Sequence, residues 1–85
     1  MSLRVTGTVQ GVFYRTSAQH IAEGLGVYGF IQNNLDGSVT VEAEGTPRAV
    51  EEFIAWCKIG TARAQVTALD AEPGGLQHFT DFHVR

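Results

Sequence analysis

Apolar residues recur with two different periods along this chain, and the order of these periods restricts the fold more than any other feature. Residues 3–10 and 39–43 alternate between apolar and polar positions, and β-prone residues are frequent in 27–33, 64–71 and 79–85. A period of two is typical of a strand that buries one face. We therefore expect strands in these ranges, the last of them short.

Two further stretches carry apolar side chains at helical spacing. From Thr16 the apolar residues follow i, i+3, i+4 and i+7, and Gly24 and Gly26 then end the segment. Residues 47–60 repeat this stripe, with Thr46 as the expected cap and a proline in the first turn. The order βαββαβ, with one apolar stripe on each helix, predicts an α+β fold. We expect a ferredoxin-like sandwich in which two helices cover one face of an antiparallel sheet.

The first predicted strand leads into a segment suited to binding an anion. Within residues 7–15 the β pattern breaks at Gly11, and an arginine stands just before the first predicted helix. Residues 16–19 (Thr-Ser-Ala-Gln) fit a capping box, so loop N–H groups can converge at a helix N-terminus, where the dipole favours negative charge. Arg15 adds a planar, permanently charged fork. We call residues 10–15 the anion loop and expect it to bind a phosphoryl group.

Two stretches of the chain resemble the signatures of the acylphosphatases. Residues 7–15 fit the pattern G-x-V-Q-G-V-x-[FY]-R without exception. Residues 29–45 fit G-[FYW]-[AVC]-[KRQAM]-N-x3-G-x-V-x5-G except at Ile31, where a smaller apolar residue is usual. We expect that departure to change core packing more than chemistry. The similarity also includes the helix between the signatures and residues 81–85, so it covers essentially the whole chain.

The resemblance implies roles for the residues of the anion loop and for one asparagine of the second signature. Arg15 and the backbone N–H groups of the anion loop would bind the phosphate of an acyl phosphate, and Gly11 would permit a positive φ. The family pattern selects Asn33, and not Asn34, as the residue that orients the attacking water. A carboxamide suits this role because it donates and accepts hydrogen bonds without titrating. Alternatively, Asn33 only ends a strand before a turn, and the side chains at 12–14 only pack around the loop. The residues assigned to phosphate binding are Gln10, Gly11, Val12, Phe13, Tyr14 and Arg15.

Length, charge and cysteine content narrow the possible classes of protein. The 85 residues suffice for one domain, residues 1–85. A net charge of −3 with a single lysine, Lys58, disfavours nucleic-acid binding. The single cysteine, Cys57, cannot form an internal disulfide. We see no leader at the start of the sequence and no apolar run long enough to span a bilayer. We therefore expect a cytoplasmic monomer. No metal or cofactor is expected, because none of the three histidines has a recognised zinc spacing: His20, His78 and His83.

The resemblance, together with the absence of a metal motif, implies a metal-independent acylphosphatase that hydrolyses the carboxyl–phosphate bond by in-line attack of water, with inorganic phosphate or sulfate as a competing anion. The alternative is a binding module, because the signatures also resemble the N-terminal domain of a hydrogenase-maturation carbamoyltransferase, which handles carbamoyl phosphate. That domain is followed by cysteine pairs, whereas this sequence ends at Arg85. An RNA-binding module would need basic and aromatic residues on the open sheet face. No residue identifies the acyl group.

Overall fold

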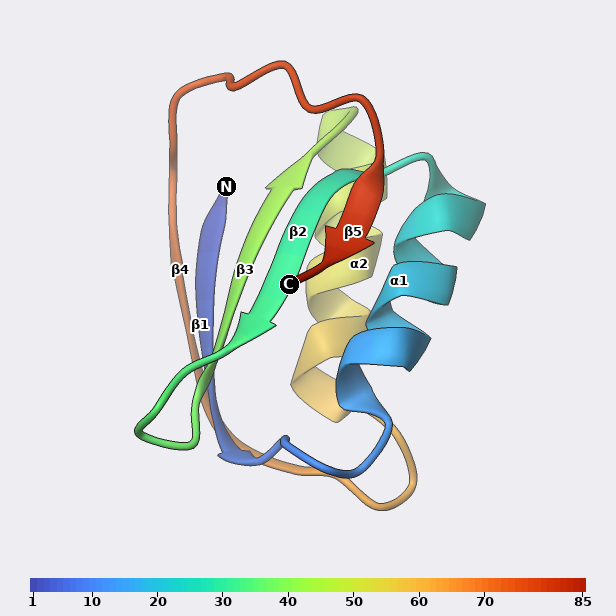
Figure 1. The fold of residues 1–85 in the computed structure, drawn as a ribbon. Coiled ribbons are helices and arrows are strands. Elements are labelled where there is room, and N and C mark those ends of the chain that lie inside the picture. Colours follow the sequence, from blue (N-terminus) through green and yellow to red (C-terminus); the bar gives the residue numbers. More distant parts are fainter.

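The computed structural model describes residues 1–85 and has two layers, a sheet and a pair of helices. In Figure 1 both helices lie on the same face of a five-stranded sheet, and its other face is open. The predicted α+β sandwich is therefore confirmed. The elements in chain order are β1 (Ser2–Thr8), α1 (Tyr14–Leu25), β2 (Tyr28–Asn33), β3 (Val39–Glu44), α2 (Pro47–Ile59), β4 (Gln65–Glu72) and β5 (Phe82–Val84).

The sheet is mixed, which corrects the prediction of an antiparallel sheet. The strand order is β4-β1-β3-β2-β5, and every neighbouring pair is antiparallel except β2 and β5, which are parallel. The loop after β4 crosses the end of the sheet at which β4 finishes (Figure 1), so β5 runs back in the direction of β1 and β2. Residue periodicity indicates that a strand forms, but it contains no information on which neighbour the strand pairs with.

The core lies between the sheet and the helices. Burial alternates along β1 and β3, as the period of two predicts. The ring of Phe53 on α2 meets that of Phe82 on β5 edge to face, with centroids 5.4 Å apart, and so joins the second helix to the short last strand. The buried apolar residues are Leu3, Val5, Val9, Tyr14, Ala18, Ala22, Val27, Ile31, Val39, Val41, Ala43, Phe53, Cys57 and Phe82.

The second helix begins and ends as its sequence predicts. The Thr46 hydroxyl accepts a hydrogen bond from the Ala49 N–H at 3.2 Å, and Pro47 occupies the first turn. Gly60 follows the last turn, and its N–H donates to the Trp56 carbonyl at 2.8 Å. Neither helix is long and apolar enough to cross a membrane.

The first helix begins differently from the prediction. It starts at Tyr14 and not at Thr16, and no side chain caps it, so the predicted capping box is wrong. Gln19, its expected second member, donates its amide to the Phe82 carbonyl at 3.1 Å instead. β1 also ends at Thr8, two residues before the expected boundary. The anion loop therefore leads directly into a helix whose first turn has no side-chain cap.

Candidate active site

The anion loop links β1 to α1 at the end of the sheet where the turn between β2 and β3 also lies (Figure 1). Its backbone passes through two left-handed residues, Gly11 with φ 71° and Phe13 with φ 61°. Glycine adopts this conformation readily, which agrees with the prediction for Gly11, but a phenylalanine rarely does. Sequence patterns therefore did not predict the left-handed conformation of Phe13, a residue that is 70% exposed. A cavity of about 220 Å³ results, lined by Val9, Gly11, Phe13, Tyr14, Arg15 and Thr16.

The N-terminus of α1 presents free hydrogen-bond donors to this cavity. The first N–H that makes a hydrogen bond within the helix is that of Ser17, which donates to the Phe13 carbonyl at 3.0 Å. The N–H groups of the preceding three residues, 14–16, have no acceptor within the helix. The first turn also contains no acidic residue. Because the helix dipole adds partial positive charge here, the site suits an oxyanion.

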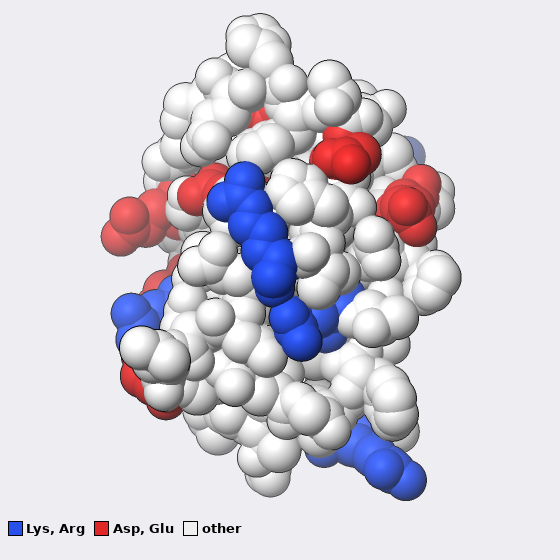
Figure 2. All heavy atoms as spheres, viewed as in Figure 1, with Lys and Arg blue, Asp and Glu red and all other residues white.

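Arg15 is linked to β2 through the last residue of the sequence, Arg85. The Arg15 Nη1 donates to the backbone oxygen of Arg85 at 2.8 Å. The Arg85 N–H in turn donates to the Ile31 carbonyl at 2.8 Å, two residues before Asn33, the last residue of β2. No Asp or Glu side chain pairs with Arg15. Its charge therefore remains available for an anion, and Figure 2 shows Lys and Arg atoms gathered in the middle of the face on which β5 ends.

Arg85 is a neighbour of the site that sequence reasoning missed. Its guanidinium carbon stands 3.7 Å from the centroid of the Phe30 ring, a cation–π contact. Its Nε donates to His83 Nε2 at 3.1 Å, and His83 Nδ1 lies 3.0 Å from the Asp81 carboxylate. These contacts hold the chain end beside β2. No local pattern could indicate the contact of Arg85 with Arg15, because 70 residues separate the two.

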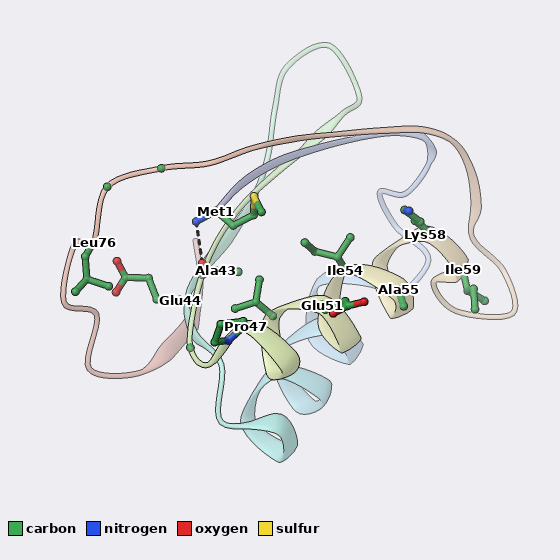
Figure 3. Close-up of a pocket in the computed structure, with 14 residues that line it drawn as sticks. Met1, Ala43, Glu44, Pro47, Glu51, Ile54, Ala55, Lys58, Ile59 and Leu76 are labelled. Atoms are coloured by element: carbon green, nitrogen blue, oxygen red, sulfur yellow. Dashed lines mark hydrogen bonds between the residues drawn. The ribbon is translucent and has the colours of Figure 1, made fainter.

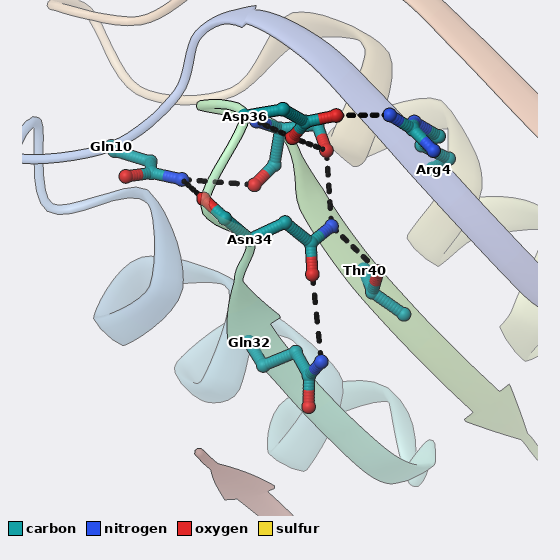
Figure 4. A network of polar contacts seen from close by, with 7 residues as sticks. Arg4, Gln10, Gln32, Asn34, Asp36 and Thr40 are labelled. Carbon is teal, nitrogen blue, oxygen red and sulfur yellow. Dashed lines mark hydrogen bonds and ion pairs between the residues drawn. The ribbon is translucent and has the colours of Figure 1, made fainter.

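The neighbouring asparagines Asn33 and Asn34 face opposite sides of the sheet. Side chains alternate along a strand, so Asn33 shares the face of Ile31, which is buried beneath the helices. Asn33 is exposed, and the side-chain hydrogen bonds of this region involve Asn34 and not Asn33. The Asn34 carboxamide instead donates to the hydroxyls of Ser38 at 3.0 Å and Thr40 at 2.8 Å (Figure 4). Of the two, only Asn33 has a carboxamide free to contact a ligand.

Two side-chain hydrogen bonds fix the anion loop, one to α2 and one to Thr61. The Tyr14 hydroxyl donates to the Cys57 carbonyl at 2.7 Å, and its ring lies 5.3 Å from that of Trp56. Burial raises the pKa of the Tyr14 phenol far above its usual range, so it remains a donor. Burial also raises the pKa of the Cys57 thiol to about 12, as expected for a packed cysteine. The Thr61 hydroxyl donates to the Val12 carbonyl at 2.9 Å and holds the loop from behind.

A larger cavity lies elsewhere. It measures about 830 Å³ and lies between α2 and the loop that joins β4 to β5 (Figure 3). None of its lining residues belongs to the anion loop or to β2. In the structure no three His, Cys, Asp or Glu side chains are grouped so that they could hold a metal ion.

Comparisons with known proteins agree with this geometry. The acylphosphatase family model matches residues 1–84. An acylphosphatase from a Nocardioides species is 41% identical over 85 residues, which cover 100% of this chain and 86% of that protein. The crystal structure of acylphosphatase from Bacillus subtilis superposes with a TM-score of 0.94 at 30% identity, over 99% of this chain and 94% of that one.

A larger protein contains the same fold. The structure of full-length HypF in its phosphate- and nucleotide-bound form matches 99% of this chain with a TM-score of 0.92, but over only 11% of its own length. The identity is 24%, so this likeness concerns the fold alone. The match of the family model and the identity to curated relatives decide the assignment, and both confirm the resemblance seen in the two signatures. This chain belongs to the acylphosphatase family.

Proposed function

We propose that this protein is an enzyme that hydrolyses the carboxyl–phosphate bond of acyl phosphates, giving a carboxylate and inorganic phosphate. The observation that carries the proposal is the uncapped start of α1, whose free N–H groups line a cavity beside Arg15. Arg15 makes one hydrogen bond, to the Arg85 oxygen, and pairs with no Asp or Glu side chain. Family membership supplies the substrate class, since the relatives are named acylphosphatases.

In this reaction the loop N–H groups and the Arg15 guanidinium hold the phosphoryl oxygens, and Asn33 orients a water for in-line attack on phosphorus. The bond from the attacking water forms as the bond to the carboxylate oxygen breaks. A carboxylate is a good leaving group and phosphoryl transition states are loose, so positioning and charge stabilisation suffice without a strong protein base. The proton of the water passes to the phosphate of the substrate.

The same proposal assigns no cofactor or metal to the protein and treats residues 1–85 as one working unit. We expect a monomer in the cytoplasm, in keeping with its single, buried cysteine. Inorganic phosphate and sulfate should compete with substrate, because they carry the tetrahedral oxygens that the anion loop recognises. The acyl group would project away from the loop into solvent.

Hydrolysis of benzoyl phosphate in excess EDTA, compared with hydrolysis of p-nitrophenyl phosphate, tests this function. We expect rapid turnover of the acyl phosphate and almost none of the monoester, whose leaving group is poorer. Binding of acyl phosphate without turnover would indicate a non-catalytic binding module instead. Activity lost on chelation and restored by a divalent ion would contradict the proposed chemistry.

A further inference from the structure

One side chain joins the two loops that carry the proposed site. The Gln10 amide nitrogen donates to the Asn34 carbonyl at 2.8 Å and to the Ser38 carbonyl at 2.9 Å (Figure 4). Each amide hydrogen thus has its own acceptor, and rotating the amide by 180° would set its oxygen against two carbonyls. No other hydrogen bond connects residues 10–16 with residues 33–38.

The acceptors of Gln10 stand at the two ends of the β2–β3 turn, residues 34–38. Inside the turn, the Asn34 N–H donates to the Ser38 carbonyl at 2.8 Å, and the Gly37 N–H donates to the Asn34 carbonyl at 3.2 Å. The hydroxyl and N–H of Ser38 donate to Asp36 Oδ1, at 2.6 and 2.9 Å, and lower the pKa of that carboxyl. The turn is therefore a closed unit, and Asn33 directly precedes it.

The anion loop does not depend on Gln10 in the same way. The Thr61 hydroxyl holds it through the Val12 carbonyl, and the buried Tyr14 fixes the start of α1. Removing the Gln10 amide would therefore leave the loop in place and release the turn from it. Arg4 pairs with Asp36 of the turn, but Arg4 is part of β1 and its ion pair does not involve the anion loop.

We infer that the Gln10 side chain is a positioning residue that sets the place of Asn33 relative to the phosphate bound in the anion loop. The inference rests on the proposed function, in which Asn33 orients the attacking water. It adds a separate role for Gln10, whose backbone N–H belongs to the anion loop while its side chain reaches the opposite turn. A misplacement of about 1 Å in such a site can cost up to about 100-fold in rate.

The test replaces Gln10 by methionine, which keeps the length of the side chain and removes both donors. Gln32→Met is the matched control, because the Gln32 amide also reaches the turn, at 3.5 Å from Asn34 Oδ1, but from the open face of the sheet. We expect Gln10→Met to lower kcat for benzoyl phosphate about tenfold and to leave the inhibition constant of phosphate within about twofold. The control should behave as the wild type.

A double-mutant cycle with Asn33→Ala then shows whether Gln10 acts through Asn33 or stabilises the site independently of it. If Gln10 acts through Asn33, Gln10→Met should change kcat by less than about twofold in the Asn33→Ala background. An equal loss in both backgrounds, or an inhibition constant that rises as kcat falls, would overturn the inference. Gln10→Leu, which also removes both donors and adds no charge to the anion loop, replaces the methionine variant if that variant does not fold.

Hydrogen exchange gives a readout that does not need activity. The amides of residues 34–38 should exchange faster in Gln10→Met than in Gln32→Met or the wild type. Unchanged exchange would contradict the inference even in an active enzyme. Faster exchange in a protein that does not hydrolyse benzoyl phosphate would overturn the proposed function while preserving the link between the two loops.

Discussion

The two helices of this protein begin in opposite ways. At α2 the Thr46 hydroxyl caps the Ala49 N–H, and Pro47 fills a position whose N–H would otherwise lack a partner. At α1 the residue before the helix is Phe13 in a left-handed conformation, and no side chain caps the first turn. The helix that only supports the sheet satisfies its own terminus, whereas the helix at the candidate site leaves its terminus free for a ligand.

This difference shows where sequence reasoning fails in a small domain. Local preferences predict the helices and strands that serve only to stabilise the fold. At functional sites a protein departs from these local preferences. An uncapped helix start next to a strained residue is costly in isolation. A bound oxyanion would repay that cost by accepting hydrogen bonds from the N–H groups of residues 14–16.

The largest effect should come from Arg15, the charged group at the uncapped terminus. Arg15→Ala should lower kcat/KM for benzoyl phosphate at least ~100-fold, comparable to the loss of one preorganised donor. Arg15→Lys should not restore it, because an ammonium cannot replace a bidentate fork. Steady-state kinetics of the two variants measures this. Near-normal kinetics for Arg15→Lys would contradict the forked contact.

Asn33→Ala should lower kcat about 10- to 100-fold and barely change the affinity for phosphate, since the anion contacts lie in the other loop. Asn34→Ala is the control. It removes the hydrogen bonds to Ser38 and Thr40 and should cost about 1 kcal/mol of unfolding free energy for each. It should keep most of the turnover. An inactive Asn34→Ala beside an active Asn33→Ala would reverse the two assignments.

Phosphate should stabilise the wild type and not Arg15→Ala. At a phosphate concentration 100 times the dissociation constant, the free energy of unfolding should rise by about 2.7 kcal/mol. A thermal melt with and without phosphate, and again with sulfate, measures the gain. Stabilisation of equal size in Arg15→Ala would place the anion outside the anion loop.

We expect the smallest effects at the two threonines that the sequence predicts as helix caps, Thr46 and Thr16. Thr46→Ala should cost about 1 kcal/mol of unfolding free energy and leave kcat/KM unchanged. Thr16→Ala should cost less than about 0.5 kcal/mol, because Thr16 lies inside α1 and caps nothing. Chemical denaturation of both variants decides this. A Thr16 variant as destabilised as the Thr46 variant would restore the capping box.

Much of the fold could be predicted because it depends on local periods. The bounds of α2 and the ends of β2 and β3 at the Asp36–Gly37 turn follow from capping, apolar spacing and turn chemistry. The parallel direction of β5 could not, because it depends on a crossover between distant edges of the sheet. At the site, motif spacing indicated Arg15 and Asn33.

The contacts that join those two residues to the rest of the site could not be predicted. The bond of Arg15 to the Arg85 backbone and the bonds of the Gln10 side chain to the β2–β3 turn arise from tertiary packing. Neither leaves a periodic trace in the sequence. The left-handed Phe13 was missed because glycine and asparagine are the usual signals for that conformation.

Titration of the amide-labelled protein with inorganic phosphate, followed by NMR, tests the central claim most directly. The free N–H groups at the start of α1 should respond to the anion, and the capped start of α2 should not. We predict shifts concentrated in the amides of residues 10–16, which reach half of their maximum at the phosphate concentration that inhibits benzoyl phosphate hydrolysis by half at low substrate. Shifts confined to the amides of residues 47–50, or a molecule that does not respond, would contradict the account.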